Sequence, residues 1–598
     1  MKTIFFAPHS AIWVHAFPEA LVAESLKQHG HQIVYVGCGG VFRQHCVPMA
    51  AHRLEPFAAE ADKDRVCREC HANKRLIASR FGFEGFDIVE ILTPEDYAEA
   101  DRLVAASSPD TFLSIVQDGV EVGRAALSTF LLTYKRIRLE FSPREWAIFA
   151  IELRNTLLSF FACRRVLDRE RPDRIILYSS GYSVNLVWCH LAQRRGIPFY
   201  YMNAGSNLSD RLQKVVIHRG HSLQLRLLDY WDQFQRIPCS SHTLAYVTDH
   251  LLELLRGRSS FVYSSPTGAT PELDIRERFG IAKQQKVLLA TMSSYDEIFA
   301  ARVTGLLRSD FPVLFPDQVD WVKALLGYVR ERPDLFLIIR VHPREFPNKR
   351  DSVKSEHALE LERVFSELPP NACVNWPVDE ISLYDIANIT DVCLNAWSSV
   401  GKEFSLLGVP VVIYSPDLVF YPPDLNYCGT TPQAYFSAIE QALREGWSFE
   451  RSRRAYRWQA LEDLYSRIDI SDGYRFKEHG HRSVALRAFD RARRILSPYF
   501  RQRLDCRNRP RSIHSAQVIS EVVTSGKDSV LELRDPRAFE GTTIEEETVE
   551  LRRQLRRVGL ALAGGKQDAR SPGNLCAHLI EEDLGRPSAF AARAAASR

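Results

Sequence analysis

Residues 335–410 constrain the fold most strongly, because apolar strand-like runs alternate there with polar turns and short helices. The run LFLIIR leads into His342 and Pro343, and the run DVCLNAW leads into a Ser-Ser turn, a short helix and the strand-like VPVVIYS. In an open α/β sheet, ligands bind in the crevice beyond the carboxyl ends of the strands. The pattern therefore predicts an α/β domain with a ligand site built from these two turns.

The same alternation recurs in the first third of the chain, around residues 2–37 and 174–202. At 598 residues the chain is too long for one hydrophobic core. We expect an α/β protein with two doubly wound, Rossmann-like domains. The predicted parts are an N-terminal α/β domain at 1–270 with a helical insertion at about 94–170, a second α/β domain at 271–440, C-terminal helices at 441–500, and a partly disordered tail at 501–598.

The first strand, KTIFFA, is expected to be followed by a loop at residues 8–17, and a helix is expected to begin at Pro18. The segment lacks a G-x-G-x-x-G pattern, so no dinucleotide fingerprint is present. His9 and His15 in this segment, and Glu19 just after it, are candidates for a general base that activates a hydroxyl group. The alternative for each histidine is a hydrogen-bonded residue of the interface between the two domains.

Four cysteines fall close together, at Cys38, Cys46, Cys67 and Cys70. The last two form a C-x-x-C pair followed by His71, a pattern found at c-type haem attachment sites, but haem attachment requires export. A C-x-x-C pair supplies two ligands from one turn, so a structural zinc ion held by the four cysteines is one hypothesis. An iron–sulphur cluster and plain free thiols are the alternatives.

The net charge of +3 does not predict nucleic-acid binding. Pro8 interrupts the first apolar run, and no segment is expected to reach the roughly 20 apolar residues of a membrane span. We therefore expect a cytoplasmic protein. Arginine-rich runs at 451–458, 491–494 and 501–511 suit contact with anionic lipid at the inner face of the cell membrane, or are solvated helix faces.

The pairing of R-V-H-P at 340–343 with W-S-S-V-G-K-E-F-S-L-L-G-V-P-V at 397–411 resembles the capsule polysaccharide biosynthesis family of GT-B glycosyltransferases, which includes capsular Kdo transferases. It is also similar to CDP-glycerol glycerophosphotransferases and bacterial polysialyltransferases. The resemblance covers the second predicted domain, and the first agrees only in architecture. It implies that His342, Ser398 and Ser399 contact the donor phosphates and that Glu403 holds the ribose hydroxyls.

The residue types support a phosphate site independently of the resemblance. Charge-assisted hydrogen bonds from Arg340 or His342 suit a phosphate, and each is worth roughly 1.5–3 kcal/mol. Lys402 is a further candidate, and Ser293 and Ser294 end another strand of the same domain. Each candidate also has an explanation without a ligand. His342 could be hydrogen-bonded to the backbone, and Ser399 could only cap a helix. Lys402 and Glu403 could be surface residues.

The resemblance implies a glycosyltransferase that moves a sugar from a CMP- or UDP-linked donor to a surface polysaccharide or glycolipid. No D-x-D motif lies in the donor-site segments, so no catalytic metal or other catalytic cofactor is expected. A glycerophosphotransferase using CDP-glycerol and a non-catalytic scaffold that binds nucleotide or polymer are the alternatives.

Overall fold

The computed structural model describes residues 1–205, 210–221, 227–258, 263, 265–267, 275–307, 314–348, 352–473, 488, 492, 515–564 and 575–580. The chain forms two compact units. The first comprises residues 1–133, 138–223 and 466–533, and the second comprises 134–137, 224–465 and 534–598.

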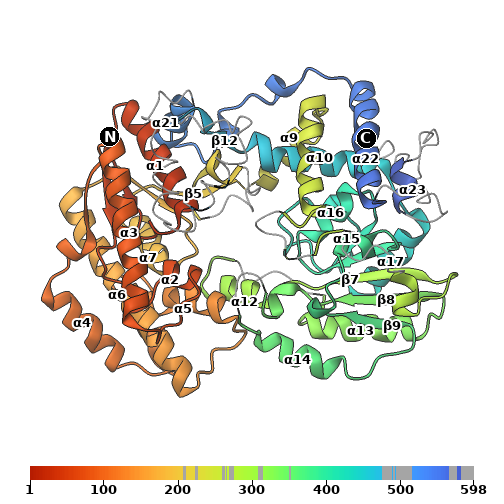
Figure 1. Ribbon diagram of the computed structural model, residues 1–598, viewed down its shortest axis with the longest axis horizontal. Helices are drawn as coiled ribbons and strands as arrows, with labels where there is room; N and C mark the ends of the chain where they lie inside the picture. Colours follow the sequence, from red (N-terminus) through yellow and green to blue (C-terminus); the bar gives the residue numbers. More distant parts are fainter. Residues whose placement is uncertain are drawn as a thin grey trace. The chain divides into compact units, whose positions relative to one another are not determined.

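The first unit is built on a mostly parallel sheet (Figure 1). In its described part the strand order is β12-β6-β5-β4-β1-β2-β3. The strands from β3 across to β5 pair in parallel, and β6 and β12 add an antiparallel edge. The strands are β1 (Lys2–Phe6), β2 (Gln32–Gly37), β3 (Glu84–Asp87), β4 (Arg174–Tyr178), β5 (Phe199–Ala204), β6 (Lys214–Arg219) and β12 (Ile468–Asp469). The order reverses between β1 and β4, which is where such sheets bind ligands.

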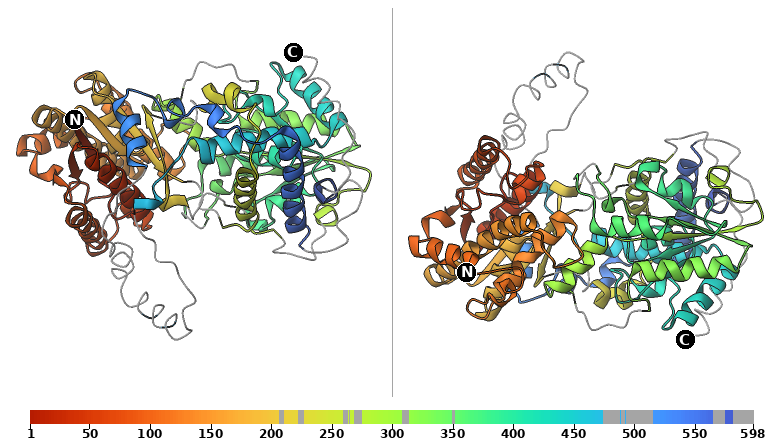
Figure 2. Two further views of the ribbon diagram at one scale, coloured as in Figure 1. Left: turned by 90° about the horizontal axis from the view of Figure 1, so that it is seen from above. Right: turned by 90° about the horizontal axis from the view of Figure 1, so that it is seen from below.

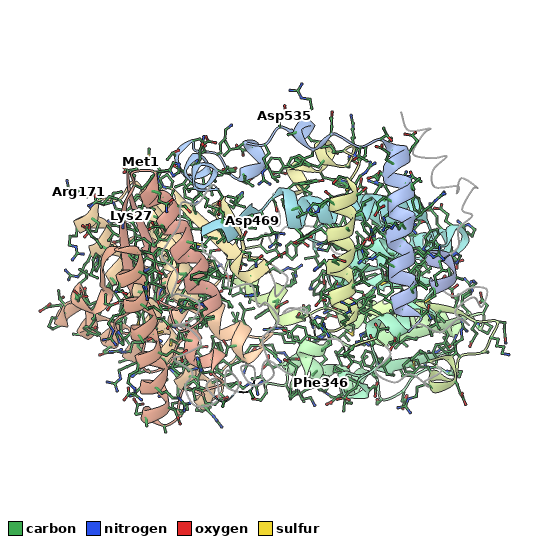
Figure 3. The ribbon with its side chains drawn as sticks, turned by 45° about the horizontal axis from the view of Figure 1, so that its top comes forward. Met1, Lys27, Arg171, Phe346, Asp469 and Asp535 are labelled. Atoms are coloured by element: carbon green, nitrogen blue, oxygen red, sulfur yellow. The ribbon has the colours of Figure 1, made fainter. Side chains whose placement is uncertain are left out.

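Helices cover both faces of this sheet, because alternate strand residues point to opposite faces. Phe5 belongs to a core shared with α1 (Trp13–Gln28), α3 (Glu60–Phe81) and α21 (Ala516–Thr524). Phe6 points the other way and stacks on Trp188 of α7 (Ser183–Arg194), with ring centroids 4.1 Å apart. Met1 and Arg171 precede β1 and β4, so they mark the amino end of the sheet (Figure 3).

Helix α1 begins at Trp13, five residues before the predicted start at Pro18. Proline lacks the N–H that a helix interior needs, but the second turn of α1 accommodates Pro18. His15 therefore lies on a helix, and the expectation that residues 8–17 form a loop was wrong at this position.

The predicted helical insertion contains α4 (Pro94–Ala105), α5 (Val122–Tyr134) and α6 (Pro143–Glu170), and α2 (Val47–Ala51) precedes it. Contrary to the sequence expectation, α6 is long and apolar enough to cross a membrane, judged by its length and composition. Its most apolar stretch is 72% buried inside the protein, and α6 packs along α7. Its apolar character is accounted for by burial in the first unit.

The second unit has a fully parallel sheet in its described part, with strand order β11-β10-β7-β8-β9. Figure 2 shows helices on both sides of these strands. The strands are β7 (Lys286–Thr291), β8 (Leu335–Arg340), β9 (Ala372–Asn375), β10 (Val392–Asn395) and β11 (Val411–Ile413). The order reverses between β7 and β10. Two such sheets in two units confirm the predicted fold class.

Between β7 and β11 the strands of the second unit are separated by helices, as predicted, and further helices precede and follow them in the chain. The helices of the second unit are α9 (Trp231–Phe234), α10 (Ser241–Leu255), α11 (Ile275–Phe279), α12 (Tyr295–Val303), α13 (Gln318–Arg330), α14 (Glu356–Val364), α15 (Leu383–Ala387), α16 (Val400–Leu406), α17 (Pro432–Glu445), α18 (Phe449–Ala460), α22 (Ile544–Leu562) and α23 (Leu575–Ile580). Helices α13 and α17 share a core with β7, β8 and β10. Helix α22 packs along α10 and α23.

The two units begin and end at different residues from those of the predicted domains. The chain leaves the first unit at residue 223 rather than 270, and residues 466–533 return to it through β12 and α21. Within the predicted tail, α21, α22 and α23 are folded elements. Residues 474–487, 489–491, 493–514, 565–574 and 581–598 lie outside the described residues.

The arginine-rich run at 451–458 does not form a solvated basic face. Arg451 is 1% exposed and donates to the carbonyl oxygen of Gly408 at 3.0 Å. Arg457 pairs with Glu547, and Arg454 pairs with Asp424. These arginines of the run make contacts inside the second unit. The runs at 491–494 and 501–511 lie outside the fully described segments.

Candidate functional site

A pocket lies at the carboxyl ends of β7, β8 and β10, beside the point where the strand order of the second unit reverses. It holds about 520 Å³ of empty space, part of it open to solvent. Five of the predicted donor-binding residues line it, namely Arg340, His342, Ser398, Ser399 and Glu403. The two turns singled out in the sequence therefore form one site, because parallel strands end at the same edge of a sheet.

His342 caps the short 3-10 helix η5 (Pro343–Glu345) that follows β8. Its Nδ1 atom accepts a hydrogen bond from the backbone N–H of Arg344 at 3.2 Å. An imidazole nitrogen that accepts is unprotonated, so the neutral ring carries its proton on Nε2. Burial lowers the pKa of His342, which keeps the ring neutral near pH 7. His342 thus offers one N–H donor to the pocket that it lines.

Arg340 ends β8 and is 7% exposed. Its guanidinium donates to the side-chain oxygen of Asn375 and to the carbonyl oxygen of Ile381 at 3.1 Å. Burial lowers its pKa to about 10, so the group remains charged at neutral pH. These bonds fix the guanidinium at the base of the pocket, where its positive charge favours an anionic ligand.

The Ser-Ser turn leads into α16 and brings three polar side chains to the pocket. The hydroxyl of Ser398 accepts from the N–H of Val400 at 3.3 Å. The hydroxyl of Ser399 donates to Oε1 of Glu403 at 2.8 Å, and the hydroxyl of Tyr384 donates to Oε2 at 2.8 Å. Both oxygens of Glu403 are therefore oriented, and each keeps a lone pair for a further donor.

Three predicted donor-binding residues do not line this pocket. Ser293 is 2% exposed, and its hydroxyl accepts from the N–H of Trp397 at 3.0 Å, which links the turns after β7 and β10. The hydroxyl of Ser294 donates to Glu297 at 2.9 Å. Lys402 pairs with Glu462, and although burial opposes its charge, Glu462 and Asp463 raise its pKa. These residues brace the site rather than face it.

Tyr384 and Thr291 are pocket residues that the sequence analysis missed. Tyr384 lies on α15, and no local sequence pattern marks it as a ligand residue. Thr291 is the last residue of β7, and its hydroxyl donates to Oδ1 of Asn395 at 2.9 Å. Its position at a strand end is the one signal that could have indicated it.

The histidines proposed as bases lie in the first unit, near the turns that follow β1 and β4. The ring of His15 stacks on Tyr178 with centroids 4.0 Å apart, and the ring of His9 meets Tyr182 edge-on at 4.9 Å. Burial lowers the pKa of each histidine to about 3, and for His15 the neighbouring His9 adds to the effect. Both rings are therefore neutral at physiological pH.

Glu19 differs from these two histidines in its protonation state. It is 3% exposed, and burial raises its pKa well above the ordinary value, against the lowering effect of a hydrogen bond from Tyr35. A carboxyl group that stays protonated at neutral pH does not act as a general base. Glu19 is accordingly a weaker candidate than either histidine.

Glu152 of α6 is a buried acid that the sequence analysis did not single out. It lines a small pocket of about 220 Å³ together with His9 and Asn155. Burial raises the pKa of Glu152 to about 7, while hydrogen bonds with Ser183 and Thr129 act in the opposite direction. Glu152 can therefore gain or lose a proton near neutral pH beside a histidine.

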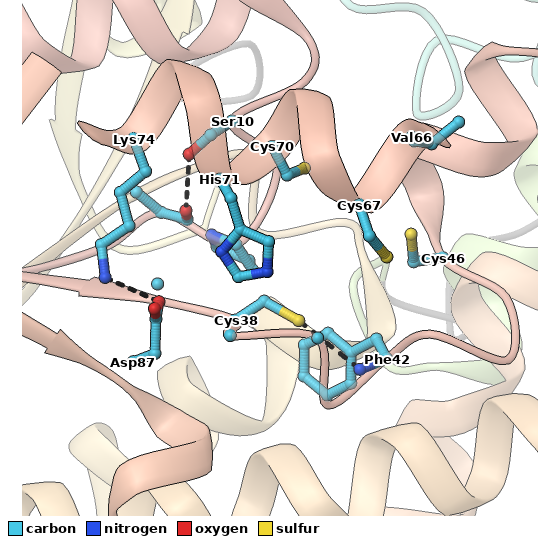
Figure 4. A pocket seen from close by; sticks show the side chains of 15 residues that line it. Ser10, Cys38, Phe42, Cys46, Val66, Cys67, Cys70, His71, Lys74 and Asp87 are labelled. Atoms are coloured by element: carbon cyan, nitrogen blue, oxygen red, sulfur yellow. Dashed lines mark hydrogen bonds and ion pairs between the residues drawn. The ribbon is translucent and has the colours of Figure 1, made fainter. Parts of the chain in front are cut away.

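The four clustered cysteines line one pocket of the first unit, with about 470 Å³ of empty space partly open to solvent (Figure 4). Burial raises the pKa of each thiol, to about 12 for Cys38 and Cys70. Within the described part of the chain, no three His, Cys, Asp or Glu side chains are already arranged to hold a metal ion. The zinc hypothesis therefore stays a prediction.

Comparisons with known proteins found similar solved structures but no match to a protein family or to a curated sequence. The chain is similar to the UDP-GlcNAc 2-epimerase from Neisseria meningitidis bound to UDP-GlcNAc (12% identity, 77% of this chain and 98% of that chain, TM-score 0.27). It is also similar to the β-Kdo 2,4 transferase KpsC of Thermosulfurimonas dismutans (14%, 48% and 79%, 0.29) and to the calicheamicin glycosyltransferase CalG4 (13%, 77% and 94%, 0.24). These similarities are too weak to assign an activity, and the fold rests on the two sheets themselves.

Proposed function

We propose that the chain is a glycosyltransferase whose nucleotide-activated donor binds in the pocket at the carboxyl ends of β7, β8 and β10. One observation carries the proposal: Arg340, His342 and the Ser398–Ser399 turn, from two distant segments, converge on one crevice at a strand-order reversal. A cation, a ring N–H and hydroxyl groups are the donors that a phosphate or diphosphate requires.

The pocket chemistry suits departure of a nucleotide. When the glycosidic bond to a phosphate breaks, negative charge develops on the leaving phosphate oxygens. Fixed donors aimed at that charge stabilise the transition state without reorganising. His342 would donate from Nε2 and Ser398 and Ser399 from their hydroxyls, while Arg340 supplies positive charge from the base of the pocket.

Glu403 is placed to recognise the ribose of the nucleotide. Its two carboxylate oxygens are held by Ser399 and Tyr384, at 2.8 Å in each case. A carboxylate oriented in this way accepts hydrogen bonds from a vicinal diol without a rotational entropy cost. This role distinguishes Glu403 from the phosphate-binding residues.

A base must also take the proton of the acceptor hydroxyl if the hydroxyl attacks directly. His9 and His15 are the proposed bases, since both are neutral; burial lowers the pKa of each ring to about 3, so that pKa must rise when the substrate binds for the ring to take the proton. His9 has the stronger support because it lines a pocket with Glu152, whose carboxylate form would stabilise the imidazolium. Retaining transfer would not need this step.

The finer description rests on the sequence. From the resemblance we propose a CMP- or UDP-linked sugar donor and a surface polysaccharide or glycolipid acceptor. From the lack of a D-x-D motif in the donor-site segments we propose transfer without a catalytic metal, and from the interrupted apolar run at the first strand we propose a cytoplasmic location.

A nucleotide screen tests the donor site directly. Thermal-shift measurements with CMP, CDP, UDP and GDP on the full chain should show stabilisation by one of them, since a ligand of the folded state raises Tm. His342→Ala should abolish the shift, whereas Ser366→Ala, which changes an exposed hydroxyl outside the pocket, should preserve it. No response of the wild-type protein to any nucleotide would remove the basis of the proposal.

A further inference from the structure

One small pocket of the first unit, which we call the His9 pocket, contains buried polar side chains whose hydrogen bonds are incomplete. It holds about 220 Å³ of empty space. His9 reaches it from the turn after β1, and Glu152 and Asn155 reach it from α6. Residues three apart on a helix share a face, which brings both α6 side chains to the same pocket. The remaining walls are apolar and consist of Phe42, Cys46, Val47 and Val184.

The incomplete hydrogen bonds belong to the two ring nitrogens of His9 and to Oδ1 of Asn155. The two residues are 5% and 2% exposed. Among the described residues, no group forms a hydrogen bond with any of these three atoms. The Asn155 amide is nevertheless held, because its Nδ2 donates to the carbonyl oxygen of His45 at 2.8 Å. Buried polar atoms without partners are costly, which indicates a pocket built to receive a polar group.

The unpartnered atoms select a group that both donates and accepts hydrogen bonds. A neutral imidazole has one N–H donor and one acceptor nitrogen, and the Asn155 oxygen only accepts. An anion such as phosphate has no hydrogen for these acceptors, and none of the described residues that line the pocket is a lysine or an arginine. An ammonium group cannot accept from the His9 N–H. A hydroxyl group can make both kinds of bond.

We infer that the His9 pocket holds a vicinal diol of the acceptor, the attacking hydroxyl donating to His9 and its neighbour donating to Oδ1 of Asn155. This inference rests on the proposed function, in which His9 takes the proton of the acceptor hydroxyl. A hydroxyl that donates to His9 has no second hydrogen for Asn155. The adjacent hydroxyl of the same ligand must therefore supply that hydrogen.

A diol site of this kind makes Asn155 a specificity-determining residue. An acceptor whose neighbouring hydroxyl is missing, methylated or already glycosylated would leave Oδ1 of Asn155 without a partner and would bind more weakly. Glu152 can bond to either hydroxyl, because burial raises its pKa to about 7 and its carboxyl group donates when protonated and accepts when ionised. The apolar walls strengthen the selection, since bulk water does not compete for these bonds.

Histidine NMR of the full-length protein tests the inference without requiring transfer. Protein labelled with ¹³C at histidine Cε1 is titrated with cis-1,2-cyclohexanediol, and His9→Asn identifies the signal of His9. The diol should shift this signal and leave that of His29, an exposed residue outside the pocket, unchanged. Cyclohexanol and cis-2-methoxycyclohexanol keep the ring but lack the second O–H. Each should bind about fivefold more weakly than the diol.

A substitution of Asn155 shows whether this residue recognises the second hydroxyl. Asn155→Leu removes the acceptor atom, so it should weaken diol binding by about fivefold and leave cyclohexanol binding unchanged. The control Gln193→Leu replaces an exposed amide outside the pocket and should change neither. The three-ligand comparison on the wild-type protein keeps the inference testable if Asn155→Leu does not fold.

Two results would overturn the inference. One is cyclohexanol binding as tightly as the diol. The other is a His9 signal that does not respond to the diol at any concentration the protein tolerates, which would mean that the pocket holds water only. The nucleotide screen separates this inference from the proposed function. Nucleotide binding with an unresponsive His9 would overturn the diol site alone, whereas a diol response without nucleotide binding would support the diol site and remove the proposed transfer.

Discussion

The backbone N–H of Arg344 donates to Nδ1 of His342 at 3.2 Å, so the same ring that lines the pocket also caps the turn that follows β8. The side chain of Arg344 reaches Asp296 of α12, with Nη2 and Oδ2 separated by 2.8 Å. His342 is thus held through Nδ1, and Nε2–H is left as its donor. We propose that the cap uses Nδ1 and that a ligand would use Nε2.

That division predicts opposite behaviour for two substitutions of His342. Asparagine can accept from the Arg344 N–H as a cap but has no donor at the Nε2 position. Glutamine can place an N–H near the Nε2 position but caps poorly. His342→Asn should keep Tm and lose the nucleotide-induced shift, whereas His342→Gln should lower stability by about 0.5–2 kcal/mol and keep part of the shift.

Differential scanning fluorimetry with and without nucleotide checks both substitutions in one experiment. His342→Ala removes both roles and serves as the reference. A His342→Asn protein that binds nucleotide like the wild type would show that the imidazole serves only as a cap.

Glu403 is expected to recognise the ribose rather than the phosphates. A carboxylate that accepts from the 2′ and 3′ hydroxyls makes a ribonucleotide bind better than its 2′-deoxy form. Loss of one charged hydrogen bond corresponds to about a tenfold change in affinity or more. Glu403→Gln should therefore weaken ribonucleotide binding and remove the preference over the deoxynucleotide.

Isothermal titration calorimetry with the ribo and deoxy forms of the same nucleotide measures this preference. Tyr384→Phe should reduce it less, because Ser399 still orients one oxygen of Glu403. An unchanged preference in Glu403→Gln would place the ribose elsewhere.

Gly401 is required where α16 begins, because its neighbours approach too closely for a side chain. A Cβ atom at this position would lie 2.0 Å from the hydroxyl of Tyr421 and 2.6 Å from Nδ2 of Asn395. Asn395 also donates to the carbonyl oxygen of Ser398 at 3.0 Å, so a shift would disturb the pocket. Gly401→Ala should cost about 1–3 kcal/mol and weaken nucleotide binding.

Gly327 provides the matched control for this substitution. It lies inside α13 and is exposed, and a Cβ atom added there would meet no neighbouring group within 4 Å. Gly327→Ala should raise stability by about 0.5–1 kcal/mol, as alanine does in a helix interior. Urea unfolding of both variants measures the contrast, and equal effects in both would contradict the steric explanation.

The convergence of His342 with Ser398 and Ser399 could be predicted from sequence, because parallel strands end at one edge of a sheet whatever their separation along the chain. The directions in which the side chains of Lys402 and Glu403 point could not be predicted from the sequence. Adjacent helical residues point about 100° apart, and the choice depended on Glu462, a distant residue that pairs with Lys402. The residues at which the units begin and end could not be predicted from the sequence either, because α21 packs against α1 although the two helices lie far apart in the chain.

Glu152 should make the stability of the protein depend on pH. Its pKa is raised by burial from 4.5 in the unfolded chain to about 7 in the folded one, so the folded state holds the proton more tightly. The resulting stabilisation is complete below about pH 4.5 and is lost as the pH rises through about 7. Glu152→Gln removes this dependence. As the pH rises from about 4.5 to about 7, the free energy of unfolding of the variant should therefore rise by about 3 kcal/mol relative to that of the wild type.

Unfolding free energies of wild type and Glu152→Gln, measured from pH 4.5 to 8, test this prediction. Glu84→Gln, at an exposed position, is the control for loss of a carboxylate. A constant difference between wild type and Glu152→Gln across the range would mean that Glu152 does not titrate there.

Glu547 of α22 tests whether the C-terminal part of the chain is integral to the second unit. It is 1% exposed, accepts from Nε of Arg457 at 2.9 Å, and accepts from the N–H of Cys239 at 2.7 Å. Removing one partner of a buried ion pair leaves the other charge uncompensated and costs about 3–5 kcal/mol. Glu547→Ala should therefore lower Tm sharply, whereas Glu545→Gln, an exposed neighbour on the same helix, should leave Tm unchanged. Nearly equal Tm values for the two variants would contradict this prediction. They would show that the contacts of Glu547 with Arg457 and Cys239 are not needed for the stability of the unit.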